Sequence, residues 1–569
     1  MKRNLFIFVV AMLLSVASAF AQTTDVLWKK NFGGSDRDLY YSVIAVSDGI
    51  VAVGYSSSAS FGNGDWAGVT EKGSHDAIIV KHDNAGNVVW KKNFGGNNDD
   101  YYQSVTAVSD GVVAVGYSTT GSFGNGDWKG VTGKGNWDAI IVKYDNAGNV
   151  VWKKNFGGSG YDEYFSVTAV SDGVVAVGLS DSFGNGDWTG VTEKGGIDAI
   201  IIKYDNAGNV VWKKRFGGSD WDYFYSVTAV SDGVVAVGYS GISTSGGNGD
   251  WEGVTGKGND DAIIVKYDNA GNVIWKKNFG GSDRDLYYSV IAVSDGIVAV
   301  GYSSSASFGN GDWEGVTGKG NDDAIIVKYD NVGNVVWKKN FGGSDYDEYF
   351  SVTAISDGIV AVGLSNSFGN GDWTGVTEKG GIDAIIVKYD NAGNVVWKKN
   401  FGGSDYDRYY SVIAVSDGIV AVGWSNPESF GNGDWAGVTG KGNLDAIMVK
   451  YGNGVGIAET DNYPSLRVYP NPTTGALWVV TDHVRNDGRD GARPVSTTPT
   501  PTTTITNIEI FDMMGRTVHV ETRHATSLQS QIENRPSPIE MNISHLPTGI
   551  YFLRIMTDEG VVVRKVVKE

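Results

Sequence analysis

Short apolar runs alternate with clusters of turn-forming residues along most of this chain. In one representative stretch, runs rich in Val, Ile, Tyr and Trp occupy 87–94, 104–109, 112–117 and 139–144. Such runs, bounded by Gly, Asp, Asn and Ser, predict four short β-strands. The segments 109–111 and 145–149 predict tight hairpin turns, in which glycine supplies the positive φ. No sustained helical period occurs in this region, so the pattern predicts antiparallel sheet.

The four-strand pattern recurs seven times. A Trp-Lys-Lys tripeptide starts at residues 28, 90, 152, 212, 275, 337 and 397, and segment 31–66 recurs unchanged as 278–313. Seven units of four strands are typical of a β-propeller. A linear solenoid is the alternative, although its repeats are usually shorter.

The two ends of the repeat array favour the closed ring. A first Trp-containing strand at 26–32 precedes any complete unit, and the last unit stops after its strand at 446–451. The N-terminal strand can therefore complete the last sheet, which removes two sheet edges that an open solenoid would have to cap. We predict an all-β fold in which residues 22–451 form a seven-bladed propeller. Because the predicted leader ends at residue 21, only residues 22–25 would precede the closing strand.

The repeats resemble a known bacterial family. The run 138–158, Asp-Ala-Ile-Ile-Val-Lys-Tyr-Asp-Asn-Ala-Gly-Asn-Val-Val-Trp-Lys-Lys-Asn-Phe-Gly-Gly, is similar to the "sequence-based β-propeller" repeats of exported proteins. The resemblance covers about residues 25–452 and implies the fold and export. It implies no activity, because propellers of one fold serve many functions.

The N-terminus has the layout of a secretory signal peptide. Lys2 and Arg3 precede an apolar run at 5–14, and Ala-Phe-Ala at 19–21 predicts cleavage before Gln22. A membrane anchor is the alternative, but the apolar run is shorter than a span of about 20 residues. We therefore expect residues 1–21 to be removed, and we expect no transmembrane span in the mature chain.

Composition narrows the partners further. The chain has 81 glycines, no cysteine, six histidines and a formal net charge of −19. The charge argues against nucleic acid as a partner, and the absence of cysteine excludes disulfides and thiolate metal sites. Only two histidines lie in the repeats, so we expect no histidine metal cluster there.

The long loop of each repeat carries the candidate ligand-binding residues. The loop of the first repeat runs about 56–76, and all seven contain Gly-Asn-Gly-Asp-Trp. An aromatic face beside carboxylate groups suits a sugar ring, and the same oxygens could hold Ca²⁺. Packing of each tryptophan onto its own blade is the more ordinary interpretation. The candidates are Asp65, Trp66, Asp127, Trp128, Asp187, Trp188, Asp250, Trp251, Asp312, Trp313, Asp372, Trp373, Asp434 and Trp435.

A second, shorter connection is expected on the same face. It brings the aspartate pairs 36/38, 99/100, 220/222, 283/285, 345/347 and 405/407, so this face is predicted to be acidic. Paired carboxylates keep a glycan-cleaving enzyme open as an alternative. Seven near-equivalent loops offer no single place where an acid and a base would differ in pKa, so we assign no catalytic residue and no cofactor beyond a possible Ca²⁺.

The C-terminal segment is a separate domain. Residues 452–465 predict a linker, and alternating apolar strands with Gly and Pro turns in 466–569 predict a small Ig-like β-sandwich. Three ordered motifs resemble the type A sorting domain of the Bacteroidota type IX secretion system, and they are carried by Pro470, Asn471, Pro472, Gly475, Gly515, Gly549 and Tyr551. Residues 483–506 form a polar insertion between the first two motifs.

The resemblance of the C-terminal segment implies the type IX machinery as a partner. It further implies passage across the outer membrane, usual removal of this domain, and either release or attachment at the cell surface.

Together these patterns predict an exported propeller that acts as a non-catalytic binding or adhesion module for an extracellular ligand, a glycan or a protein. A glycan-cleaving enzyme and a purely structural surface protein are the alternatives.

Overall fold

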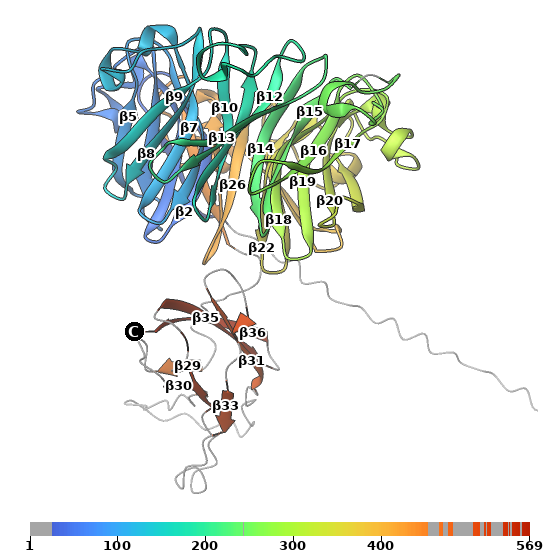
Figure 1. The fold of residues 1–569 in the computed structure, drawn as a ribbon. Helices are drawn as coiled ribbons and strands as arrows, with labels where there is room; N and C mark the ends of the chain where they lie inside the picture. Colours follow the sequence, from blue (N-terminus) through green and yellow to red (C-terminus); the bar gives the residue numbers. More distant parts are fainter. Residues whose placement is uncertain are drawn as a thin grey trace, which may run out of the picture. The chain divides into compact units, whose positions relative to one another are not determined.

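Seven four-stranded antiparallel sheets, or blades, form the repeat region (Figure 1). The computed structural model describes residues 26–242 and 244–452, and in the C-terminal part 466–469, 476–481, 505–512, 517–518, 521–524, 539–543, 546, 549–557 and 560–568. The first strands of successive blades contact one another around the whole ring. The predicted seven-bladed propeller is confirmed. The predicted leader (1–21) lies outside the described residues.

The strands follow the same order in every blade. Blades 1–3 contain β2 Asp38–Val46, β3 Gly49–Ser57, β4 His75–His82, β5 Val88–Phe94; β6 Asp100–Val108, β7 Gly111–Thr119, β8 Trp137–Asp145, β9 Val150–Phe156; β10 Asp162–Val170, β11 Gly173–Ser180, β12 Asp198–Asp205 and β13 Val210–Phe216. Blades 4–6 contain β14 Asp222–Val230, β15 Gly233–Ser240, β16 Asp261–Asp268, β17 Val273–Phe279; β18 Asp285–Val293, β19 Gly296–Ser304, β20 Asp322–Tyr329, β21 Val335–Phe341; β22 Asp347–Ile355, β23 Gly358–Ser365, β24 Asp383–Tyr389 and β25 Val395–Phe401.

The seventh blade joins the two ends of the repeat array. It contains β26 Asp407–Val415, β27 Gly418–Ser425, β28 Asp445–Tyr451 and, as its outer strand, β1 Val26–Phe32. Strand β1 pairs antiparallel with β28, from Val26 opposite Tyr451 to Phe32 opposite Ala446. The predicted ring closure by the N-terminal strand is therefore confirmed.

The long loops between the second and third strands contain short 3₁₀ helices. These are η1 Ser58–Ser60, η2 Gly64–Trp66, η3 Thr120–Ser122, η4 Gly126–Trp128, η5 Gly186–Trp188, η6 Gly249–Trp251, η7 Ser305–Ser307, η8 Gly311–Trp313, η9 Gly371–Trp373, η10 Pro427–Ser429 and η11 Gly433–Trp435. Among the described residues, no helix is long and apolar enough to span a membrane.

The apolar core lies between adjacent blades. One buried cluster combines Val51 and Val53 of blade 1 with Tyr102 and Trp128 of blade 2, and corresponding clusters recur around the ring. The tight turns behave as predicted. Gly148 has a φ of +78°, and a Cβ atom there would lie about 3 Å from the Trp90 ring of the preceding blade.

The C-terminal unit is described by itself. It contains two four-stranded sheets, ordered β29-β30-β34-β33 and β32-β31-β35-β36. Their strands are β29 Leu466–Tyr469, β30 Ala476–Thr481, β31 Ile505–Asp512, β32 Thr517–Val518, β33 Glu521–His524, β34 Ile539–Asn542, β35 Gly549–Thr557 and β36 Gly560–Lys568. Two sheets agree with the predicted sandwich. The predicted linker after Gly452 and residues 483–504 of the predicted insertion lie outside the described residues, whereas Ile505 and Thr506, the last two residues of that insertion, belong to β31.

Candidate functional site at the mouth of the central channel

The seven tryptophans of the Gly-Asn-Gly-Asp-Trp loops are buried between adjacent blades. Trp66 is 0% exposed, and its indole nitrogen donates hydrogen bonds to Asp38 Oδ1 at 2.8 Å and Ser56 Oγ at 3.0 Å. Its ring meets the Phe32 ring edge-on at 5.0 Å. Trp128, Trp188, Trp251, Trp313, Trp373 and Trp435 are buried in the same way. No ring face is open for a sugar in this conformation, which supports the packing interpretation. Ligand binding by these rings stays a prediction that would require the loop to open.

The acceptor of the indole hydrogen bond is a buried carboxylate at the first residue of each blade. Asp38 also accepts hydrogen bonds from Ser60 Oγ at 2.8 Å and from the Gly34 amide at 2.9 Å. Burial outweighs these donors and raises the pKa of Asp38 to about 6. The same residue is buried in the other blades, as Asp100, Asp162, Asp222, Asp285, Asp347 and Asp407.

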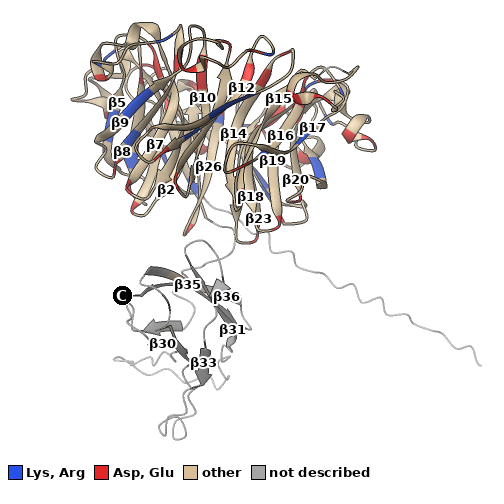
Figure 2. Cartoon of the chain, viewed as in Figure 1, with Lys and Arg blue, Asp and Glu red and all other residues tan. Residues whose placement is uncertain are grey.

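The predicted aspartate pairs are therefore split. Asp36 lies half-buried in the connection, whereas Asp38 turns into the blade. The prediction that both carboxylates face the surface is wrong, because the first strand begins at the second aspartate, earlier than its apolar run suggests. Acidic residues also lie at both ends of the blades (Figure 2). At the opposite end, for example, Asp48 pairs with Lys81 at 2.7 Å.

The aspartate of each Gly-Asn-Gly-Asp-Trp loop forms an ion pair with the preceding blade. Lys72 Nζ of blade 1 contacts Asp127 Oδ2 of blade 2 at 2.5 Å, and Lys72 also donates to the Asn93 carbonyl at 2.7 Å. Corresponding pairs join Asp187, Asp250, Asp312, Asp372, Asp434 and Asp65 to lysines of their neighbouring blades. Among the described residues, no group of three or more His, Cys, Asp or Glu side chains is arranged to hold a metal ion. These aspartates link blades in the structure, and a ligand-binding role for them stays a prediction.

Tryptophans of the Trp-Lys-Lys tripeptides also link blades. Trp90 of blade 1 donates its indole hydrogen to the Asn146 carbonyl of blade 2 at 3.2 Å. Trp28 does the same from blade 7 to the Asn84 carbonyl of blade 1 at 3.3 Å, across the closure of the ring.

The repeats differ at the residue that precedes each first strand. Two residues after the Phe-Gly-Gly-Ser/Asn tetrapeptide the side chains are Arg37, Asp99, Tyr161, Trp221, Arg284, Tyr346 and Tyr406, which we call the mouth ring. Its four aromatic side chains are 42–55% exposed. Each lies directly before the buried aspartate that begins a first strand. The first strands surround the axis of the ring, which we call the channel, and the mouth ring lies at the end of this channel that carries the long loops. Because four residue types, Arg, Asp, Tyr and Trp, occupy one scaffold position, the fold itself does not require any one of them.

Backbone contacts between blades hold the mouth ring in place. Arg37, Asp99, Tyr161, Arg284, Tyr346 and Tyr406 each form a parallel bridge with the long loop or third strand of the preceding blade. At the remaining junction, the Asp222 amide donates to the Ile197 carbonyl at 2.9 Å. Aromatic rings extend this wall, since Trp137 stacks on Tyr117 at 4.6 Å and meets Tyr161 edge-on at 5.0 Å. The ring is therefore a rigid platform.

A second variable layer lies two residues further along each first strand. It comprises Leu39, Tyr101, Glu163, Tyr223, Leu286, Glu348 and Arg408. Burial raises the pKa of Glu163 to about 8 and that of Glu348 to about 7. Gln103 Nε2 donates to Glu163 Oε1 at 3.2 Å, and the Arg408 guanidinium lies 5.3 Å from the centre of the Trp424 ring.

A third layer, two residues further along each first strand than the second layer, is mostly aromatic. Tyr225 contacts Phe165 at 5.2 Å and Tyr288 at 5.3 Å, and the series continues through Phe350, Tyr410 and Tyr41. Gln103 interrupts the series in blade 2. Blades with nearly identical cores thus present different chemistry to the channel.

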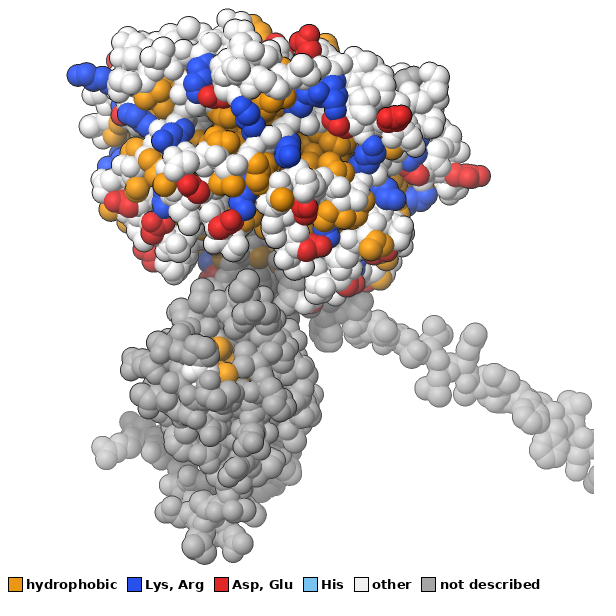
Figure 3. All heavy atoms as spheres, viewed as in Figure 1, with side chains coloured by type: hydrophobic (Ala, Val, Ile, Leu, Met, Phe, Trp, Pro, Cys, Tyr) orange, Lys and Arg blue, Asp and Glu red, His pale blue; other side chains and the backbone are white. Residues whose placement is uncertain are grey.

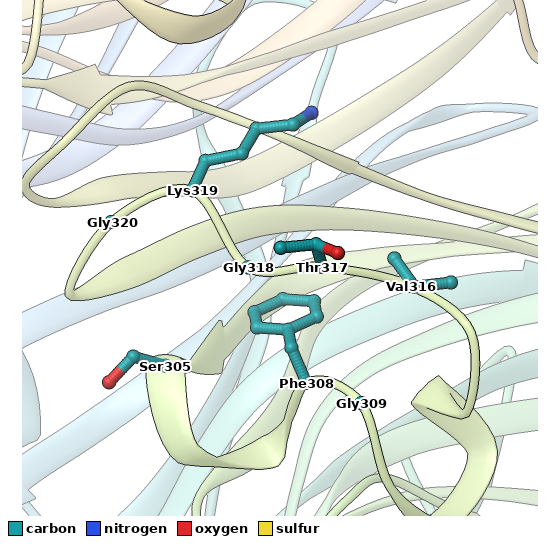
Figure 4. A pocket seen from close by; sticks show the side chains of 8 residues that line it. All are labelled: Ser305, Phe308, Gly309, Val316, Thr317, Gly318, Lys319 and Gly320. Atoms are coloured by element: carbon teal, nitrogen blue, oxygen red, sulfur yellow. The ribbon is translucent and has the colours of Figure 1, made fainter.

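Two depressions in the surface of the propeller contain no mouth-ring residue. A depression of about 410 Å³ sits in the long loop of blade 5, with the Phe308 ring beneath Gly318 and with Val316 and Thr317 beside it (Figure 4). The ammonium of Lys319 at its edge is already bound to the Asn340 carbonyl at 2.8 Å. On the outer wall, hydrophobic patches lie among Lys and Arg side chains (Figure 3). Neither feature combines exposed aromatic rings with divergence between repeats.

The mouth ring was not predicted because the motifs used in the sequence analysis are those that all seven repeats share. The missing signal was available in the sequence. When the seven copies are aligned with one another, positions 37, 39, 55 and 75 and their equivalents differ within otherwise near-identical units. Only the structure shows that these four positions meet at one end of the channel.

Two of the predicted sorting residues lie in described strands. Gly549 begins β35, and Tyr551 in the same strand is buried and stands opposite Asp512 of β31 and Val566 of β36. Pro470, Asn471, Pro472, Gly475 and Gly515 lie outside the described residues.

Known proteins resemble two parts of the chain. The regulatory protein FlaEY of Caulobacter vibrioides is 26% identical over 256 residues, which cover 41% of this chain and 26% of that protein. This chain thus matches about a quarter of that relative's length. Solved structures with a similar course include the WD40 β-propeller domain of Doa1, at 13% identity and a TM-score of 0.37 over 75% of this chain and 96% of that one. Another is a putative 6-phosphogluconolactonase from Bacteroides uniformis, at 9% identity and a TM-score of 0.32 over 64% and 85%.

The C-terminal unit has a clear family match. Residues 467–569 match the family described as the secretion system C-terminal sorting domain. This domain implies export by the type IX machinery, with secretion or attachment at the cell surface. The chain is therefore a secreted seven-bladed β-propeller protein that carries a C-terminal sorting domain.

Proposed function

We propose that this protein is a non-catalytic binding module that recognises an extracellular glycan with the mouth ring. One observation carries the proposal: repeats that are otherwise almost copies of one another diverge where their side chains are exposed on a rigid rim. The fold tolerates different side chains at these exposed positions, so they can be adapted to a ligand without loss of the scaffold. Exposed Tyr and Trp rings next to Asp and Arg side chains suit stacking on the apolar face of a sugar and hydrogen bonding to its hydroxyl groups.

Glycan-array binding by the secreted protein tests this proposal. A variant with Trp221→Ala, Tyr346→Ala and Tyr406→Ala should lose at least about tenfold in apparent affinity, because each ring offers a stacking surface of roughly 1–2 kcal/mol. The matched control carries Val89→Ala, Val211→Ala and Val336→Ala, at outer-strand positions that are 54–56% exposed. Both variants should keep the wild-type melting temperature.

The control variant should bind like the wild type. Equal binding by the mouth-ring variant and the wild type would refute the proposal. Release of new reducing ends from a bound glycan would instead favour the enzyme alternative.

The finer steps of export belong to the same proposal. We infer that residues 1–21 direct the chain into the periplasm and that the sorting domain is removed after passage across the outer membrane, before release or attachment to surface lipopolysaccharide. A reporter fused to residues 458–569, behind a signal peptide, should reach the cell surface or the medium in a type IX-competent host. Retention in the periplasm would contradict the assignment.

A further inference from the structure

Repeats 3 and 6 share a set of local differences from the other five repeats. Both are 60 residues long, because the segment between the second strand and the loop phenylalanine is two residues shorter than in repeat 1 (181–182 and 366–367 against 57–60). Both carry glutamate in the second layer, as Glu163 and Glu348, and both carry Gly-Gly-Ile at 195–197 and 380–382. These changes occur together, three blades apart.

In the structure, the shortened segments and the Gly-Gly-Ile segments contact residues of the mouth ring. The first polar side chain of each shortened segment holds the ring residue of its own blade. Asp181 Oδ1 accepts a hydrogen bond from the Tyr161 amide at 2.6 Å, and Asn366 Oδ1 accepts one from the Tyr346 amide at 2.9 Å. Both tyrosine rings are 42–46% exposed.

The second glycine of each Gly-Gly-Ile makes room for the aromatic residue of the next blade. A Cβ atom on Gly196 would lie 3.2 Å from Trp221 Nε1, and one on Gly381 would lie 2.6 Å from Tyr406 Cε1. The other repeats carry Ser or Asn at this position. Gly196 of blade 3 and Gly381 of blade 6 therefore leave space for the exposed aromatic residue of the following blade.

We infer that the mouth ring contains two equivalent sugar-binding subsites, one formed by Tyr161, Glu163 and Trp221 and the other by Tyr346, Glu348 and Tyr406, and that each takes a unit of a neutral glycan. This inference rests on the proposed function and assigns its stoichiometry and ligand class. The remaining ring positions, Arg37, Asp99 and Arg284, carry no aromatic side chain. Arg284 is already paired with Asp260, with 2.9 Å between Nε and Oδ2.

The charges around the subsites favour a neutral ligand. Asp220, Asp345 and Asp405 directly precede three of the four aromatic ring residues, and Asp181 holds the fourth. Such a rim repels a polyanionic glycan. Glu163 and Glu348 follow two residues after Tyr161 and Tyr346 in the first strands of their blades. Burial raises the pKa of both carboxyl groups, so each can donate as well as accept a hydrogen bond near neutral pH. An acidic aromatic rim also suits a cationic peptide, so the experiment compares neutral sugars with a cationic peptide.

Native mass spectrometry of the full secreted protein can count bound ligands. The probes are cellotriose, mannotriose and tri-N-acetylchitotriose as neutral trisaccharides, with trigalacturonate and hexalysine as charged counterparts. At saturation, at least one neutral trisaccharide should bind with two molecules per chain. Trp221→Ala and Tyr406→Ala should each reduce the number to one, and the double variant should bind none. Tyr41 in the channel contacts Tyr55 and Tyr410, so Tyr41→Phe, which keeps the ring, serves as a matched control that should leave two sites.

The outcomes distinguish this inference from the proposed function. One trisaccharide per wild-type chain, lost in only one of the two single variants, would overturn the two-subsite inference and leave the binding module intact. Two hexalysine molecules and no trisaccharide would overturn the ligand class. Unchanged trisaccharide binding in the double variant, with an unchanged melting temperature, would overturn both the inference and the proposed function.

Discussion

Two tryptophans of repeat 4 offer a direct test of which aromatic residues stabilise the fold and which are free to bind. Trp251 is 1% exposed and donates to Asp222 Oδ1 at 2.8 Å, whereas Trp221, the residue directly before Asp222, is 55% exposed. Phenylalanine at either position keeps an aromatic ring and removes the indole N–H. The two changes are therefore chemically identical and differ only in environment.

Two contributions determine how much Trp251→Phe should lower the free energy of unfolding. Loss of a hydrogen bond to a charged acceptor costs about 1.5–3 kcal/mol. The smaller ring also leaves a gap where Trp251 meets Phe216 edge-on at 4.9 Å, which costs roughly another 1 kcal/mol. The free energy of unfolding should fall by about 2.5–4 kcal/mol. Trp221→Phe should change it by less than about 0.5 kcal/mol, as surface substitutions usually do.

Urea unfolding followed by far-UV circular dichroism measures both values, and trisaccharide binding is measured on the same samples. Trp251→Phe should bind like the wild type under native conditions. The reasoning would be refuted if Trp251→Phe left the unfolding free energy unchanged while abolishing binding, because the buried tryptophan would then act on a ligand.

Three further predictions concern stability. Deletion of residues 22–32 should lower the melting temperature by several degrees, because β28 loses its outer partner and the buried Phe32 is removed; an unchanged value in a thermal scan would contradict ring closure. Lowering the pH from 7.5 to 5 should raise the melting temperature. Burial raises the folded pKa to about 6 from 3.8 at five of the buried first-strand aspartates, Asp38, Asp100, Asp222, Asp285 and Asp407, so the folded state binds more protons in this window and the penalty for burying the charged form is relieved as pH falls. A melting temperature that falls between pH 7.5 and pH 5 would contradict this assignment. His82 opposes the trend, because burial lowers its pKa to about 4 and the unfolded chain takes up its proton first as pH falls below 6.5. His82→Tyr restores the residue of the other repeats, whose hydroxyl pairs with the first-strand tyrosine at 2.7 Å in blade 2, and it should stabilise the protein more at pH 5 than at pH 7.5; equal gains at both values would show that His82 does not titrate in this way.

Much of the architecture could be predicted because the same pattern of strands and turns recurs in all seven repeats. The spacing of the Trp-Lys-Lys tripeptides indicated seven blades, and the unmatched strand at 26–32 indicated how the ring closes. The apolar run placed the start of the first strand of blade 2 at residue 104, four residues after its observed start at Asp100. In the sequence, an aspartate at this position is interpreted as a turn residue. The groups that stabilise the buried Asp100 carboxylate, such as Trp128 Nε1 and Ser122 Oγ, lie in a loop more than 20 residues away.

The candidate site was less predictable, for the same reason. The shared Gly-Asn-Gly-Asp-Trp motif drew attention to residues that all seven blades need, and the structure shows what they do: Trp66 satisfies a buried carboxylate, and Asp65 pairs with Lys441 across the ring closure. Export, repeat number and strand order follow from local patterns and from spacing along the chain, so the sequence alone determined them. Burial and proximity depend on which residues the closed ring brings together. Only the tertiary structure could therefore decide that the loop tryptophans are buried between adjacent blades, and that Tyr161 meets Trp137 of blade 2 while Tyr346 pairs with Asp322 of blade 5.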